Sequence, residues 1–247
     1  MKKIKTLLVR KLIVICLLAP FMAFSQGKNL MNVSKVFPKM DKMAEFEKAL
    51  TSHSQKYHTG EAKWRVYQIM SGPDAGGYMI AEGPSDFAGM DSRGDLGAEH
   101  TADYAKNVAI HMTDKYSSDY LMFQDTLSTV GLGNFSDKIT ISHWYPKFGQ
   151  NAKVFDGILA LKKGWKQGGL TVAVYRTVNS GNARFSMVYR LKNGFKDLAT
   201  GGPSAAKRRY EAANGEDSYD NYVGLLQEHT ANYWSEMLTL RPDLGSK

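Results

Sequence analysis

One short polar segment occurs twice in the chain and carries the side chains best suited to chemistry. Glu-His-Thr-Ala-Asp-Tyr begins at residue 99 and recurs 129 residues later with Asn in place of Asp. On a helix, residues four apart share a face, so each histidine would lie beside the tyrosine of its own copy. Histidine titrates near neutral pH and a tyrosine hydroxyl donates a hydrogen bond, which suits acid–base catalysis. The candidate catalytic residues are therefore His100, Tyr104, His229 and Tyr233.

A structural role for this segment is the alternative, in which its histidine and tyrosine pack under a loop and bond to the backbone.

The other histidines give weaker indications of a functional site. His53 and His58 are five residues apart near the expected end of a helix, so they do not share a face. Surface positions are favoured for both, and no metal site is predicted.

Strand residues supply the candidates for ligand binding. His143 alternates with apolar residues on the inward side of an expected strand. A satisfied core histidine is the simplest interpretation, and a ligand contact inside a barrel is the alternative. The ligand-binding candidates are His143, Trp64, Tyr67 and Tyr175.

Composition, charge and motifs exclude several classes of protein. With 43% hydrophobic and 23% charged residues, the chain is typical of a globular protein. It contains no Gly-x-Ser-x-Gly nucleophile motif, no His-Glu-x-x-His zinc motif and no phosphate-binding Walker lysine. The formal net charge of +8 falls to +3 (8 − 5) without residues 1–25, which hold five basic residues and no acidic one. No nucleic-acid partner is therefore expected.

The first 25 residues have the pattern of a secretory signal peptide. Basic residues precede an apolar run at 12–24, which is too short to span a bilayer. Small residues at Ala23 and Ser25 favour cleavage before Gln26. We therefore expect an exported protein, periplasmic or extracellular, without an integral membrane segment after cleavage. The only cysteine, Cys16, lies in this leader, so the mature chain can form no disulfide.

A second kind of self-similarity has a spacing of 108 residues. Several residues coincide at this offset: Pro38-Lys39 with Pro146-Lys147, Gly60 with Gly168, Val66-Tyr67 with Val174-Tyr175, and Phe87 with Phe195. The difference between the two offsets, 129 − 108 = 21, places an insertion near 200–220, expected as a surface loop with a helical turn. The domains predicted are a signal peptide at 1–25, one module at 26–128 and a second at 137–247, joined by a glycine-rich linker.

Each module shows the same order of hydrophobic patterns. An alternating segment that ends in proline predicts a strand, and an amphipathic helix with glycine at its end follows. Two strands joined by turn residues come next, and a second helix begins near residue 97 or 219. A last short strand is expected at 120–123, without a clear counterpart before the C-terminus. This order is that of a ferredoxin-like fold.

The modules resemble the dimeric α+β barrel superfamily, namely antibiotic-biosynthesis-monooxygenase-like and NIPSNAP-like domains. The resemblance rests on the strand-ending prolines, the helix after each, the Val-Tyr strands with their hairpins and the loops that carry Phe87 and Phe195, and it covers residues 28–245. It implies an α+β protein whose two tandem ferredoxin-like modules pack sheet to sheet. One chain would then close the barrel that two subunits usually form, as a monomeric pseudo-dimer.

Superfamily members that degrade haem use an asparagine on the first strand, a tryptophan on a later strand and a histidine on the second helix. Asn32, Trp64 and His100 are the residues here that could match. Trp64 falls on the second strand and not the third, and the second module has Thr140 and Val172 at the corresponding positions. We therefore predict no cofactor and keep haem binding as a minor alternative.

The sequence indicates a binding function and leaves the reaction open. We expect an exported, soluble barrel that binds a small, partly apolar molecule in a cleft lined by strand aromatics and the His-Tyr helix. Its enzymatic form would be a cofactor-independent oxygenase or isomerase. The alternative is a non-catalytic cell-envelope protein that serves binding or assembly. Convergence of the four His and Tyr candidates on one pocket would favour the first hypothesis, and their burial in helix contacts would favour the second.

Overall fold

The computed structural model describes residues 27–93 and 96–247, in which one order of elements occurs twice. The elements of the first half are β1 (Leu30–Pro38), α2 (Met43–Tyr57), β2 (Trp64–Ile69), β3 (Tyr78–Ser85), α3 (Phe87–Arg93), α4 (Ala98–Asp103) and β4 (Met112–Phe123). Those of the second half are β5 (Lys138–Pro146), α5 (Asn151–Gln167), β6 (Val172–Thr177), β7 (Phe185–Arg190), α6 (Pro203–Asn214), α7 (Ser218–His229) and β8 (Thr230–Leu240). The predicted signal peptide lies outside the described residues.

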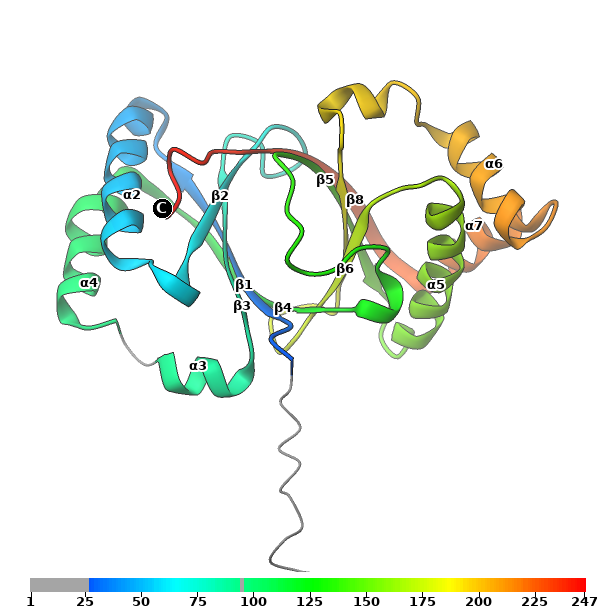
Figure 1. Ribbon diagram of the computed structural model, residues 1–247, viewed down its shortest axis with the longest axis horizontal. Coiled ribbons are helices and arrows are strands. Elements are labelled where there is room, and N and C mark those ends of the chain that lie inside the picture. Colours follow the sequence, from blue (N-terminus) through cyan, green and yellow to red (C-terminus); the bar gives the residue numbers. More distant parts are fainter. Residues whose placement is uncertain (1–26, 94–95) are drawn as a thin grey trace, which may run out of the picture.

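The eight strands form one closed antiparallel barrel in the order β1-β3-β2-β8-β5-β7-β6-β4 (Figure 1). The expected α+β barrel is confirmed, but the two sheets meet edge to edge and are not stacked face to face. Strands β4 and β8 are 12 and 11 residues long, so each pairs with the first strand of its own half and still reaches the other half. The ends of these strands make the two joints, β4 with β6 and β8 with β2.

The spacing of the elements agrees with the 108-residue offset. Strands β1 and β5 begin at residues 30 and 138, helices α2 and α5 at 43 and 151, and strands β2 and β6 at 64 and 172. Each pair is separated by 108 residues. The proline at the end of β1 or β5 and the amphipathic helix after it therefore occupy matching places in the two halves.

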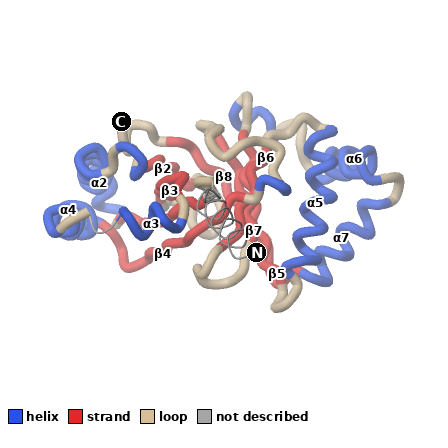
Figure 2. The backbone as a smooth tube through the Cα atoms, turned by 60° about the horizontal axis from the view of Figure 1, so that its bottom comes forward, coloured by secondary structure: helices blue, strands red, loops and turns tan. Residues whose placement is uncertain are grey.

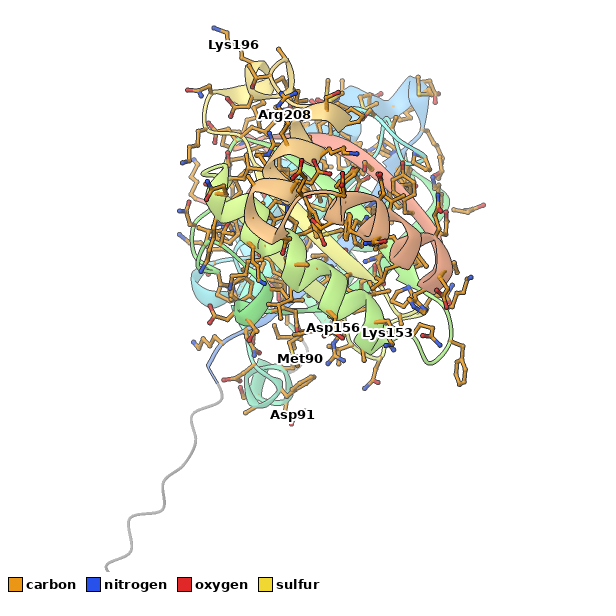
Figure 3. All side chains as sticks on the ribbon, turned by 90° about the vertical axis from the view of Figure 1, so that its right-hand side faces the viewer. Met90, Asp91, Lys153, Asp156, Lys196 and Arg208 are labelled. Atoms are coloured by element: carbon orange, nitrogen blue, oxygen red, sulfur yellow. The ribbon has the colours of Figure 1, made fainter. Side chains whose placement is uncertain are left out.

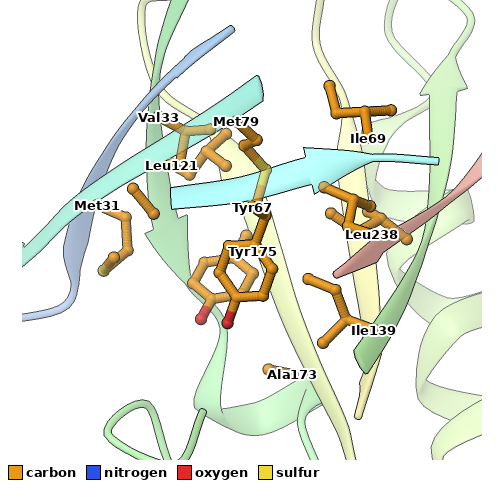
Figure 4. Close-up of a cluster of buried hydrophobic side chains, with 12 residues drawn as sticks. Met31, Val33, Tyr67, Ile69, Met79, Leu121, Ile139, Ala173, Tyr175 and Leu238 are labelled. Atoms are coloured by element: carbon orange, nitrogen blue, oxygen red, sulfur yellow. The ribbon is translucent and has the colours of Figure 1, made fainter. Parts of the chain in front are cut away.

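Strand residues alternate between the barrel interior and the helical exterior, as a period of two requires. Tyr67 and Met79 point into the barrel, whereas the neighbouring Val66 and Tyr78 pack under the helices. The interior cluster consists of buried apolar side chains from seven of the eight strands (Figure 4). The eighth strand, β7, contributes the partly buried Val188, which packs against the cluster. Separate clusters fill the spaces between the sheet and the helices of each half.

The segment between the halves closes one end of the barrel. Val130, Leu132 and Phe135 of the predicted linker pack against the interior cluster. The Phe135 ring also lies 3.8 Å from the guanidinium of Arg65 and 5.8 Å from that of Arg190. The linker is thus a packed element of the barrel.

Helices cover the barrel on two opposite sides. Figure 1 shows α2 and α4 on one side and α5, α6 and α7 on the other, and Figure 2 shows the same separation from a second direction. Figure 3 looks onto the second group, where Lys153 and Asp156 of α5 and Arg208 of α6 project outward. No helix in the described part of the chain is long and apolar enough to cross a membrane.

The region near 200–220 is a helix and not the predicted surface loop. Helix α6 occupies 12 residues of it and packs along α5. The close approach depends on Gly164 of α5, where a Cβ atom would lie 3.2 Å from the carbonyl oxygen of Arg209. Buried Ala205 and Tyr210 supply the apolar face that a solvated loop would lack.

The repeated hexapeptide adopts two different structures. In the first copy it continues α4 into a π-helical turn at Tyr104–Val108, but in the second copy the helix ends at His229 and strand β8 begins at Thr230. The prediction that Tyr233 shares a helix face with His229 is therefore wrong. Strand β8 also supplies the last strand for which the sequence shows no clear counterpart. Pairing of β8 with β5 and β2 decides the conformation, because tertiary contacts override weak local propensities.

Truncation inside the barrel tests whether its interior is a packed core. Leu238 of β8 is 0% exposed in the interior cluster. We expect Leu238→Ala to lower the free energy of unfolding by about 2–5 kcal/mol, since the lost contacts leave a cavity. The matched control is Leu159→Ala on α5, where the side chain is 37% exposed and the expected change is within about 0.5 kcal/mol. Urea unfolding measures both, and equal losses in the two variants would contradict a packed interior.

Candidate functional site

An open pocket of about 450 Å³ lies on the helical side of the first-half sheet, beside α4. This outer pocket is lined by Asn32, Ser34, Val36, His58, Trp64, Ile80, Glu82, His100, Tyr104, Met112 and Tyr116. Its volume falls in the range of about 300–1,000 Å³ that is usual for small-molecule sites. A few polar groups converge there from β1, β3 and α4 between apolar walls, which is also typical of such sites.

The predicted site residues fall into three places. Those that line the outer pocket are Trp64, His100 and Tyr104. Those that line a separate cavity inside the barrel are Tyr67, Tyr175 and His143. The remaining two, His229 and Tyr233, belong to the second half, so the four His and Tyr candidates do not converge on one pocket.

Three histidines from separate segments meet beside the outer pocket. His53 comes from α2, His58 from the residue after α2 and His100 from α4. One ring nitrogen of each lies within 4.8 Å of the others, and the Nε2 atoms of His58 and His100 are 3.3 Å apart. We call these three residues the histidine cluster. His53 and His58 are each 1% exposed, so the prediction that they lie at the surface is wrong.

Carboxylates hold two rings of the histidine cluster from behind. Asp103 Oδ2 is 2.7 Å from His53 Nδ1, and Glu82 Oε2 is 3.4 Å from His58 Nδ1. A proton placed on Nδ1 toward a carboxylate leaves the lone pair of Nε2 available on the other side of the ring. His53 Nε2 is buried and has no hydrogen-bond partner among the described residues.

Burial sets the protonation of His53. It lowers the pKa of His53 below its usual value, and the hydrogen bond to Asp103 only partly opposes this effect. The same hydrogen bond lowers the pKa of Asp103. At neutral pH the pair is therefore a neutral imidazole that donates to a carboxylate.

Aromatic rings fix the planes of the imidazoles. Trp64 stacks on His58 with ring centroids 3.5 Å apart, and its Nε1 donates to Glu82 Oε2 at 2.8 Å. The ring of Tyr104 lies edge-on to His53 at 5.2 Å. Glu82 thus positions both members of the Trp64–His58 stack.

Tyr104 stands at the start of the π-helical turn, a local structure that is frequent at functional sites. Burial raises the pKa of Tyr104 to about 12, so its hydroxyl remains protonated at neutral pH. The hydroxyl lies 3.4 Å from Met112 Sδ, a weak acceptor that a ligand oxygen can replace. The outer pocket therefore combines a hydrogen-bond donor with imidazoles that can accept a proton or a cation.

The C-terminal residues brace this site from the other half. Ser54 Oγ of α2 donates to the carbonyl of Leu244, and Ser246 Oγ accepts from the backbone nitrogen of Trp64, both at 2.8 Å. Arg241 pairs with Glu47 of α2 at 2.6 Å. The segments that carry His53 and Trp64 are thus tied to residues that follow β8.

The second half has a corresponding pocket without this chemistry. A pocket of about 560 Å³ beside α7 is lined mainly by aromatic, aliphatic and amide side chains, with no histidine or charged side chain among the described residues. Tyr233 lines it and is 71% exposed, and His229 lies 3.9 Å from Glu228 outside it. In the first half, Trp64 of β2 lies opposite Glu82 of β3. At the matching place in the second half, Val172 of β6 lies opposite Tyr189 of β7.

The cavity inside the barrel is too small for a ligand of that size. Its volume is about 70 Å³, well under the usual range of about 300–1,000 Å³. His143 is held there on both sides, by Ser186 Oγ at 3.0 Å and by Glu236 Oε1 at 2.9 Å. Lys35 neutralises Glu236 at 2.9 Å. In this structure His143 is a satisfied core residue, the simpler of the two interpretations.

Sequence reasoning missed His53, His58, Glu82 and Asp103 as members of one group. A signal for His53 was present, because it follows Phe46 and Leu50 at the spacing of the apolar face of α2. His58, Glu82 and Asp103 lie 21 to 45 residues apart along the chain. Only the folded sheet and the position of α4 bring them together.

No protein-family model matches the sequence, and neither does any curated protein. Solved structures share its fold at low sequence identity. An anthrone oxidase-like protein has a TM-score of 0.55 at 13% identity, over 87% of this chain and 92% of that chain. A candidate monooxygenase from Fusobacterium nucleatum subsp. nucleatum has a TM-score of 0.52 at 13% identity, over 85% and 91% of the two chains. A chlorite dismutase variant from Candidatus Nitrospira defluvii has a TM-score of 0.52 at 6% identity, over 87% and 92%.

These similarities establish the fold and nothing further. They agree with the closed eight-stranded barrel, so the α+β barrel that the resemblance in the sequence implies is confirmed. At 6–13% identity the side chains of a site do not carry over from one protein to another. The function must therefore be argued from the outer pocket and the histidine cluster.

The buried histidine of the barrel predicts how stability depends on pH. Burial lowers the pKa of His143 from its ordinary value of 6.5, and Glu236 only partly opposes this. Below about pH 6.5 the unfolded chain takes up a proton that the folded protein does not, so the free energy of unfolding falls as pH falls. We expect His143→Gln to remove part of the decline between about pH 6.5 and pH 5, while His53, shifted in the same direction, maintains the rest.

Urea unfolding at stepped pH measures this slope. Leu238→Ala is the control, because it lowers stability but keeps His143, and its pH dependence should equal that of the unmodified protein. An unchanged slope in His143→Gln would show that His143 is not the group responsible.

Proposed function

We propose that the protein binds a small, partly apolar molecule in the outer pocket and acts on it as an oxygenase or isomerase. The observation that carries this proposal is the outer pocket itself, in which Trp64, His100 and Tyr104 come together with an open volume of about 450 Å³. A flat aromatic ligand would lie along Trp64 and place a carbonyl oxygen near the Tyr104 hydroxyl. The choice of an oxygenase reaction for the test follows the descriptions of two neighbours, an anthrone oxidase-like protein and a candidate monooxygenase.

The residues present can carry a cofactor-independent version of this chemistry. A methylene group that is conjugated with a ketone through an aryl ring loses a proton to the His58–His100 pair, and the Tyr104 hydroxyl stabilises the resulting enolate oxygen. The carbanion then reacts with dioxygen, and loss of water leaves a second carbonyl group. For anthrone the balance is anthrone + O₂ → anthraquinone + H₂O, in which the methylene carbon is oxidised and both oxygen atoms are reduced.

Haem is the less supported ligand. Haem carries two carboxylates that need cationic partners, yet the described lining of the outer pocket includes Glu82 and no lysine or arginine. His100 Nε2, the atom that would bind iron, faces His58 Nε2 at 3.3 Å. The residues present therefore do not fit haem, although Asn32, Trp64 and His100 do line one pocket.

A non-catalytic binding role in the cell envelope is the second candidate. It is favoured by the second half, where the corresponding pocket has no histidine or charged side chain among the described residues. In this case the outer pocket would hold a ligand without turnover.

The reaction is tested with anthrone as substrate and oxygen consumption as the measurement. We expect turnover by the unmodified protein and a loss of at least about 100-fold in kcat/KM in His100→Gln, the usual effect of removing an acid–base group. His229→Gln is the matched control, because the same hexapeptide surrounds His229 on the other half, and it should retain full activity.

Binding is measured separately by equilibrium dialysis with anthraquinone, the unreactive product. Binding that is weakened by Trp64→Ala, without any oxygen consumption, would support the non-catalytic candidate. Neither binding nor turnover would contradict the proposed ligand class.

We further propose that the protein is exported after removal of residues 1–25 and acts as a monomer whose tandem halves take the place of two subunits. A native mass spectrum of the protein produced from its full-length gene tests both points. The expected species is a monomer with the mass of residues 26–247. A retained leader would contradict cleavage, and a stable dimer would contradict the pseudo-dimer.

A further inference from the structure

We propose that the histidine cluster binds a divalent transition-metal ion of the zinc type, with His53, His58 and His100 as its three protein ligands. This inference deepens the proposed function and rests on it only for the substrate. With an ion bound, His58 and His100 serve as its ligands, and a water at the open fourth position replaces the imidazole pair as the proton acceptor. Binding of the ion itself follows from the geometry of the cluster.

The distances between the ring nitrogens suit one ion. Zinc holds imidazole nitrogens at about 2.0–2.1 Å in a tetrahedron, which places two ligand nitrogens about 3.3 Å apart. The Nε2 atoms of His58 and His100 are already 3.3 Å apart. The third ring nitrogen lies within 4.8 Å of them, so a small shift of one imidazole completes the set.

The carboxylates behind the rings are those that a metal site requires. Metal-binding histidines usually donate their second ring N–H to a carboxylate, which orients the ring and strengthens the ligand. Asp103 is placed to accept from His53 Nδ1 at 2.7 Å, and Glu82 lies 3.4 Å from His58 Nδ1. In both rings Nε2 is then the nitrogen that the carboxylate leaves for a metal ion.

The buried nitrogen of His53 gives an independent indication of a ligand. His53 is 1% exposed, and its Nε2 has no hydrogen-bond partner among the described residues. Leaving a buried acceptor unsatisfied costs about 1–3 kcal/mol. A metal ion at the centre of the cluster would satisfy this atom.

The three imidazole ligands determine which metal ions can bind and leave one coordination position of the ion open. Three imidazoles without a thiolate suit zinc, cobalt, nickel or copper, whereas calcium and magnesium prefer oxygen ligands. Three protein ligands leave a fourth position open, as in catalytic zinc sites. His58 and His100 line the outer pocket, so this fourth position faces the space proposed for the substrate.

The test uses protein produced from the full-length gene, treated with a chelator and dialysed against Zn²⁺ or Co²⁺. We expect one Zn²⁺ per chain by elemental mass spectrometry, and visible absorption bands of tetrahedral Co²⁺. His100→Gln should abolish stoichiometric binding and the Co²⁺ bands. Asp103→Asn should weaken binding about 10–100-fold, because it removes the carboxylate behind His53.

The control variants are His229→Gln and His143→Gln, which should bind one ion with unchanged affinity. Asp103→Asn separates a loss of metal binding from a loss of folding. The Asp103 side chain is 24% exposed and its replacement leaves the three ligands in place, so this variant should fold. No stoichiometric binding by the unmodified protein, or binding that survives His100→Gln, would overturn the proposal.

The experiments can contradict the metal site and the oxygenase reaction independently of each other. Metal binding without anthrone turnover leaves the metal site and contradicts the oxygenase reaction. Turnover by the metal-free protein, together with no bound Zn²⁺, leaves the cofactor-independent reaction and overturns the metal site.

Discussion

Closure of the barrel by β4 and β8 is the constraint on which the other features depend. A four-stranded sheet with helices on one face must still bury its second face, and each half supplies the cover for the other. The two joints, β4 with β6 and β8 with β2, leave no free edge among the eight strands. The alternation of side chains along the strands then divides the protein into an inner core and two outer layers.

This division explains where a binding site can exist. The inner core is filled by side chains from both halves and by the linker, and only about 70 Å³ stays open. In each outer layer the helices do not cover the whole sheet, and the open areas include the outer pocket and its counterpart beside α7. The site therefore lies in the layer where coverage is incomplete, and not in the barrel that defines the fold.

Much of the fold could be predicted from the sequence, because it depends on local patterns and on a repeat spacing. The strand-ending prolines, the amphipathic helices and the 108-residue offset are all visible in the printed chain. The conformation of the second hexapeptide could not be predicted, since it is decided by the pairing of β8 with two other strands. The site is subject to the same dependence on long-range contacts. His100, Tyr104 and Trp64 could be identified by residue type. His53 and His58 join the site only through contacts with segments far along the chain.

The contrast between the halves bears on why the histidine cluster exists. At the position matched to His53 the second half has Leu161, and where the first half pairs Trp64 with Glu82 it pairs Val172 with Tyr189. That half buries an apolar cluster under its helices, so this framework does not need polar groups there for stability. Burying two imidazoles, with a third imidazole and a carboxylate half-buried beside them, is costly unless all are satisfied. Apolar replacements are often at least as stable. If stability alone decided, apolar side chains would be expected under the helices of both halves. The histidine cluster of the first half is better explained by a ligand that binds the imidazole nitrogens.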